Sequence, residues 1–187
     1  MFQSNILYIH HYGDQHNNRE INSVSDGGTD THTNLIEKLS QQYPIIISTY
    51  QDNYVAHNLF NDNKKIKIVE HFTLSGLFQK NLLFYELPLR ILYPSAKYLF
   101  INARYRYVFT QTDFLPDALT GFLLKIKYPK THWVASFFLN APKPLSKNNP
   151  YKGKQWFKGL FYYLLQLPSF WLINLFADTV LVTSDPD

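Results

Sequence analysis

Short β-prone runs alternate along this chain with longer segments whose apolar residues keep helical spacing. The runs lie at residues 5–11, 45–50, 66–69, 106–111, 132–138 and 179–183, and they contain the isoleucine, valine and aromatic residues that favour strands. Helix candidates include residues 31–39 and 118–127, whereas residues 77–99 contain Pro88 and Pro94, which predict helices broken by proline. This alternation is typical of a parallel sheet covered on both faces. We therefore expect an α/β fold with a Rossmann-like parallel sheet, built as one domain of 187 residues.

Residues 155–176 predict one long apolar helix near the end of the chain. Residues 159–177 carry no charge, which is nominally enough length to cross a bilayer. Gln166 interrupts this apolar stretch, and Trp156, Trp171 and the flanking lysines are typical of a helix at a membrane interface. Three interpretations stay open: a helix packed in the core, a helix at an interface, and a helix that spans a membrane.

Charge is distributed unevenly along the chain. The formal net charge is +4, but residues 1–63 carry −5 and residues 64–187 carry +9. Residues 118–177 contain eight lysines and no acidic residue. These lysines are either simply solvated or meet an anionic partner. Anionic lipid fits better than nucleic acid, because the arginine-rich and aromatic–glycine motifs of base-reading modules are missing. The residues expected at a membrane surface are Lys152, Lys154, Trp156 and Lys158.

Several common functions lack their sequence signals. The chain has no cysteine, which excludes disulfides, thiolate metal sites and thiol nucleophiles. The motifs G-x-G-x-x-G, G-x-x-x-x-G-K-[ST], H-E-x-x-H and G-x-S-x-G are absent, and His10 and His11 would point to opposite faces of a strand. We therefore expect neither a metal nor a cofactor. The N-terminus shows no secretory leader, which predicts a cytoplasmic protein, peripheral on the inner face of the membrane where it meets lipid.

Two segments carry candidate binding residues. Gly27 and Gly28 precede the first helix, where backbone N–H groups and the helix dipole favour an anion, although a loop that only needs permissive backbone angles would look the same. Thr112 and Asp113 follow a strand at the place where open α/β sheets bind ligands, and they are suited to sugar hydroxyls. Asp113 is equally suited to capping the helix that follows. Asn140, in the turn after the next strand, offers a donor and an acceptor.

The order of these segments resembles the N-terminal half of retaining glycosyltransferases of the GT-B fold, family 4. The resemblance rests on the first strand, the glycine pair, residues 109–117, 124–129 and 132–134, and the run 177–184. It implies an acceptor-side domain of an enzyme that transfers a sugar from a nucleotide-sugar to a glycan or lipid-linked acceptor. It also implies a C-terminal domain, absent from this chain, that binds the nucleotide-sugar, so we expect the isolated chain to be inactive. By this resemblance the donor phosphates lie near Gly27, Gly28 and Thr29, and the acceptor faces His11, Thr112, Asp113 and Asn140.

Two alternative functions remain at this stage. The D-x-D at Asp185 and Asp187 follows an apolar strand, and its carboxylates suit a divalent cation and a diphosphate, as in metal-dependent GT-A glycosyltransferases. The lysines and the long apolar helix also suit a non-catalytic module that binds a membrane surface.

Overall fold

The protein, seen here in a computed structural model, is built on a parallel sheet. The structure describes residues 4–11, 27–50, 60, 62–71, 83–137, 141–147 and 149–182. Its strands are β1 (Ser4–His10), β2 (Ile45–Tyr50), β3 (Ile66–His71), β4 (Tyr105–Thr110), β5 (His132–Ser136) and β6 (Thr179–Leu181). They form one six-stranded sheet in the order β3-β2-β1-β4-β5-β6, and every neighbouring pair is parallel. The predicted Rossmann-like α/β fold is confirmed.

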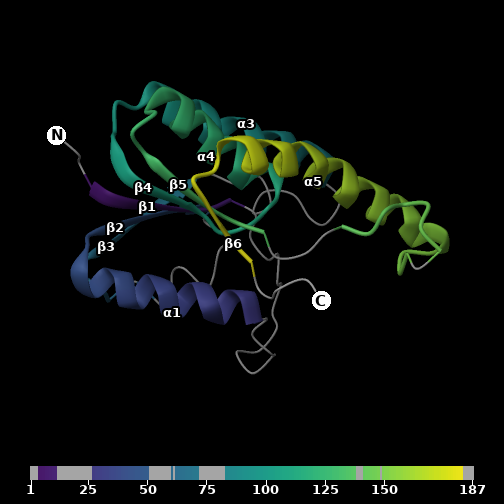
Figure 1. Ribbon diagram of the computed structural model, residues 1–187, viewed down its shortest axis with the longest axis horizontal. Helices are drawn as coiled ribbons and strands as arrows, with labels where there is room; N and C mark the ends of the chain where they lie inside the picture. Colours follow the sequence, from purple (N-terminus) through teal and green to yellow (C-terminus); the bar gives the residue numbers. More distant parts are fainter. Residues whose placement is uncertain are drawn as a thin grey trace.

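Helices cover both faces of this sheet (Figure 1). One face carries α1 (Gly27–Gln42), and the other carries α3 (Leu83–Phe100), α4 (Leu115–Lys127) and α5 (Trp156–Phe176), with the short 3-10 helix η1 (Gly153–Gln155) leading into α5. Strand β1 shows why both faces need cover. Ile6 and Tyr8 pack in the apolar cluster beside α1, whereas Leu7 and Ile9 pack in the cluster beside α4 and α5. Successive residues of a strand point to opposite faces, so an apolar strand must be buried twice.

The winding of the chain reverses between β1 and β4. Ile9 of β1 is in register with Ser48 of β2 on one side and with Thr110 of β4 on the other. The segments before β4 therefore extend the sheet in one direction and the later segments extend it in the other. In open α/β sheets the ligand site lies outside the carboxyl ends of the strands at such a reversal.

Helix α3 continues through both of its prolines, so the prediction of broken helices in this region is wrong for residues 83–100. A proline in a helix leaves the carbonyl four residues earlier without its N–H partner. For Pro94 that carbonyl belongs to Arg90, and the Tyr50 hydroxyl donates to it at 3.1 Å. The Arg90 guanidinium also lies 4.6 Å from the Tyr50 ring centroid. A side chain of β2 thus satisfies the backbone group that the proline leaves free.

Helix α4 begins with Pro116 in its first turn, but Asp113 does not cap it. The N-cap residue is Phe114, in extended conformation and without a side-chain cap hydrogen bond. Asp113 is buried and its carboxylate accepts a hydrogen bond from Gln166 instead. The preference of aspartate for helix caps is a local effect, and here a partner on α5 overrides it.

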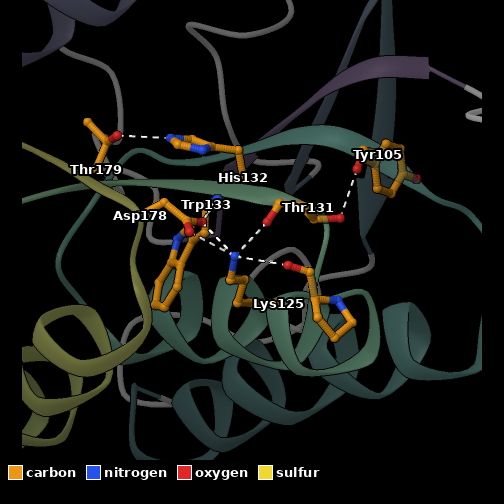
Figure 2. Close-up of polar contacts among 8 residues, drawn as sticks. Tyr105, Lys125, Thr131, His132, Trp133, Asp178 and Thr179 are labelled. Carbon is orange, nitrogen blue, oxygen red and sulfur yellow. Dashed lines mark hydrogen bonds and ion pairs between the residues drawn. The ribbon is translucent and has the colours of Figure 1, made fainter.

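The amino edge of the sheet is held by an ion pair (Figure 2). Lys125 of α4 points toward Asp178, with Nζ 2.8 Å from the carboxylate, and it also donates to the carbonyls of Pro129 and Thr131. The same carboxylate accepts from the backbone N–H of Trp133 at 2.7 Å. Burial raises the pKa of the Asp178 carboxyl, but the hydrogen bonds from Lys125 and Trp133 outweigh burial, so the pKa lies below its ordinary value of 3.8. This contact joins α4, β5 and β6 away from the carboxyl edge.

Replacing Asp178 by asparagine is expected to lower the free energy of unfolding by about 1 kcal/mol at neutral pH, because the ion pair is partly exposed to solvent. A carboxyl with a lowered pKa stabilises the fold above its unfolded-state value, and this contribution disappears as the pH falls through the folded-state value. The difference between wild type and Asp178→Asn in urea unfolding should therefore shrink below about pH 4. Asp62→Asn, at an exposed position, is the matched control; an equal loss there, or a loss independent of pH, contradicts the assignment.

Candidate functional site

The Asp117 carboxylate joins the carboxyl ends of the two strands at the winding reversal. Oδ1 accepts from the backbone N–H of His11 at 2.6 Å, and Oδ2 accepts from the backbone N–H and the hydroxyl of Thr112 at 3.0 and 2.7 Å. Asp117 is fully buried in the first turn of α4, where a negative charge is also favoured by the helix dipole. His11 follows β1 and Thr112 follows β4, so one side chain sets the spacing of the two strand ends.

The glycine pair lies at this same edge. Helix α1 begins at Gly27, and the side chains of residues 27–31 lie outside the described part of the structure. The first described side chain of the helix, His32, is buried, with Nε2 3.4 Å from the Ser136 hydroxyl at the carboxyl end of β5. The amino end of α1 and the Thr112–Asp117 segment therefore open onto one edge of the sheet.

Asp113 connects this edge to α5. Gln166 Nε2 donates to the Asp113 carboxylate, and Gln166 Oε1 accepts from the backbone N–H of Ala141, both at 2.5 Å. All three groups are buried or partly buried. The amide of Gln166 thus bridges the loop after β4 and the loop after β5. The sequence analysis missed this role, although a glutamine in a long apolar helix was its signal.

A cavity of about 470 Å³ lies beside this bridge. It is lined by Phe137, Ala141, Pro142, Lys143, Tyr163, Gln166, Leu167 and Phe170. Phe137 directly follows β5, so the cavity is at the carboxyl edge of the sheet. Its walls are largely aromatic and aliphatic, while Lys143, Tyr163 and Gln166 supply a cation, a hydroxyl and an amide. Apolar walls with a few polar groups are typical of small-molecule sites.

A buried polar chain lies on the α3 side of the same edge. The Ser48 hydroxyl is 2.8 Å from Nε2 of both His11 and His71, and all three residues are fully buried. Neither Nδ1 atom has a hydrogen-bond partner within the described residues. Burial lowers the pKa of His71 to about 4, and burial together with the neighbouring His71 lowers the pKa of His11 well below its ordinary value. His11 is therefore a neutral, internal residue, which places its ring away from an acceptor.

The remaining predicted site residues are distributed differently. Thr112 is half-buried and its hydroxyl is bonded to Asp117, and Asn140 lies outside the described residues. Lys152 is exposed, whereas the side chains of Lys154 and Lys158 lie outside the described part. Trp156 is half-buried, and its indole N–H donates to the Pro144 carbonyl at 3.0 Å, so it also anchors the preceding loop. The D-x-D at 185–187 lies outside the described residues.

The fold and this edge define a doubly wound α/β domain with its candidate ligand site at the winding reversal. Among the described residues, no three His, Asp or Glu side chains lie close enough together to hold a metal ion. No protein-family model, curated protein or solved structure matches the chain at a significant level.

Replacing Asp117 by alanine removes the acceptor of one buried backbone N–H, that of His11, and of one partly buried N–H, that of Thr112. We expect a loss of about 2–4 kcal/mol in the free energy of unfolding, because each unpaired buried group costs on the order of 1–3 kcal/mol. Thr112→Val removes the hydroxyl's bond to Asp117 and its long 3.4 Å bond from the Phe114 backbone N–H, and should cost about 1 kcal/mol. Chemical denaturation gives both values, and hydrogen exchange at the amides of His11 and Thr112 should accelerate in Asp117→Ala. Equal losses in the two variants, with unchanged exchange, contradict this role.

The buried histidines predict a fold that weakens in mild acid. Both have folded-state pKa values below the ordinary 6.5, so between pH 6.5 and about 4 the unfolded chain binds more protons than the folded one. Stability should therefore fall as the pH drops through this window, by up to about 1.4 kcal/mol per pH unit for each histidine. Urea unfolding across the window measures the slope, and His71→Gln should reduce it. A flat profile in the wild type, or an unchanged slope in His71→Gln, contradicts the prediction.

Proposed function

We propose that this chain is the acceptor-side domain of a glycosyltransferase, which transfers a sugar from a nucleotide-sugar to a glycan or lipid-linked acceptor. The proposal rests on one observation above all. The amino end of α1 and the segment after β4 open onto the same carboxyl edge, at the place where the winding of a parallel sheet reverses. The order of segments that resembles GT-B enzymes of family 4 runs along the same residues.

The amino end of α1 supports the donor side of this proposal. Residues 27–30 form its first turn, and the backbone N–H groups of a first helical turn have no partner within the helix. Gly27 and Gly28 carry no β-carbon, so a diphosphate can approach this turn closely. The departing nucleotide diphosphate carries the charge that develops during sugar transfer, and positive dipoles held in place stabilise it. In this proposal a second domain binds the rest of the nucleotide-sugar.

The cavity beside α5 supports the acceptor side. Tyr163 and Gln166 offer hydrogen bonds to sugar hydroxyls, and Lys143 offers a charge to an anionic group of the acceptor. The aromatic walls suit the flat apolar face of a sugar ring or a lipid chain. Asp113 acts through Gln166, whose amide it orients, and Asp117 positions the loop that carries Asp113. In this proposal these contacts hold the acceptor in a fixed geometry, which lowers the barrier to transfer.

The direct test is sugar transfer by the chain together with the second domain that the proposal requires. Radiolabelled UDP-, GDP- and dTDP-sugars are supplied with glycan and lipid-linked acceptors, and products are separated from donor. Transfer from at least one donor is expected. The absence of transfer from every donor, with a folded protein shown by its cooperative unfolding, contradicts the proposal.

Within an active enzyme, Lys143→Gln should lower kcat/KM for the acceptor by about tenfold or more, the effect of losing one charge-assisted hydrogen bond. Lys130→Gln removes the same charge at an exposed position after α4, away from the carboxyl edge, and should leave kcat/KM unchanged. Initial rates at varied acceptor concentration measure both variants. Equal losses of kcat/KM in the two variants would mean that net charge causes the loss and that Lys143 does not contact the acceptor.

A further inference from the structure

Helix α5 has large apolar side chains on its exposed face, whereas its buried face combines one isoleucine with small or polar residues. The buried residues are Gly159, Gln166, Ser169 and Ile173, at spacings that place them on one side of a helix. The opposite side, here called the outer face, consists of Phe157, Leu164, Trp171 and Leu175, with 71%, 55%, 56% and 64% of each residue exposed. A helix on a domain surface in water normally has the reverse pattern. The outer face is therefore suited to contact with an apolar surface.

The helix nevertheless belongs to the domain and does not leave it. Ile173 is part of the apolar cluster with Trp133 and Leu124, and Gln166 is hydrogen-bonded to Asp113. The window Gly159–Phe176 has a mean hydropathy of 1.2, and 22% of it is buried. The interpretation of α5 as a core helix is thus wrong for most of its surface. A membrane-spanning position would break the contacts of the buried face, whereas a position along an interface keeps them.

Charge next to the outer face indicates what kind of apolar surface it meets. Lys143, Lys147 and Lys152 are exposed in the segment that leads into α5. Residues 118–177 contain no acidic residue, so no carboxylate of this stretch opposes an anionic partner. A second copy of this chain would bring the same lysines toward one another, which is unfavourable. An anionic lipid bilayer supplies both an apolar layer and negative headgroups, and tryptophan prefers the boundary between them.

We propose that α5 docks this protein onto an anionic lipid surface, with its outer face in the headgroup boundary and the lysines of 143–152 on the headgroups. Leu167 and Phe170 are exposed beside the outer face and also line the cavity at the carboxyl edge. The docked protein thus holds its cavity at the bilayer. The docking itself does not depend on glycosyl transfer.

Flotation with lipid vesicles, without any sugar or nucleotide, tests the docking. The chain is mixed with phosphatidylcholine vesicles that contain about 30% phosphatidylglycerol, and with vesicles of phosphatidylcholine alone. Binding to the anionic vesicles is expected, with release in about 0.5 M NaCl, because salt screens the lysines. Quenching of tryptophan fluorescence by brominated lipid should accompany binding and comes from Trp171 and the half-buried Trp156 of α5, since Trp133 is buried in the core.

Two pairs of variants separate the apolar and the charged contributions. Leu164→Gln with Trp171→Gln should weaken partitioning by about tenfold or more, because two exposed apolar side chains lose their burial in lipid. Tyr43→Gln, an exposed aromatic position at the end of α1, is the control on the opposite face of the sheet.

For the charged contribution, Lys147→Glu with Lys152→Glu should weaken partitioning into the anionic vesicles by a similar factor. Lys64→Glu with Lys67→Glu makes the same charge change beside β3 and should have little effect.

Three results would overturn the proposal. One is equal binding to neutral and anionic vesicles, or no binding to either. Another is equal weakening by the variants and their controls. The third is a dimer in sedimentation equilibrium that dissociates in the α5 variants while vesicle binding is absent, since a second copy would then occupy the outer face. Because the assay contains no sugar, its failure leaves sugar transfer to be decided by its own experiment.

Discussion

The buried carboxylate of Asp117 is the contact on which the arrangement of this protein depends. It accepts hydrogen bonds from the residues that follow β1 and β4, the two strands between which the winding of the sheet reverses. A buried charge is stable only when its hydrogen bonds are satisfied. Here those bonds come from two strand ends and from a hydroxyl. The charge is therefore satisfied only when the two strand ends hold the spacing seen at the carboxyl edge. The loop to Asp113, and through Gln166 the position of α5, follow from it.

The amino and carboxyl edges of the sheet carry different kinds of contact. At the amino edge, Lys125 and Asp178 are partly exposed, and their contact joins α4, β5 and β6. At the carboxyl edge, polar groups are buried, histidines stay neutral, and a cavity opens between α5 and the loop after β5. A parallel sheet makes this division possible because all strands end on the same side. Binding residues can then change without disturbing the contacts that hold the opposite edge.

The alternation of strands and helices was readable from the sequence because each element carries its own local pattern. The parallel order and the glycine pair at the start of α1 were predicted in this way. What the sequence did not show depends on distant partners. Asp117 is 106 positions from His11, and Asp113 leaves its expected cap because Gln166 lies 53 positions further on. The outer face of α5 was ambiguous because an apolar helix looks alike whether its surroundings are protein or lipid.

The contact between Tyr50 and α3 links two positions of the sequence that share no local pattern. The hydroxyl is useful because Pro94 withdraws the N–H that the Arg90 carbonyl would otherwise bind. If residue 94 could donate an N–H, phenylalanine could replace tyrosine at position 50. With proline at 94, phenylalanine at position 50 would leave the buried carbonyl oxygen of Arg90 without a hydrogen-bond donor. Positions 50 and 94 are therefore energetically coupled, so that a change at either costs least when the other changes with it.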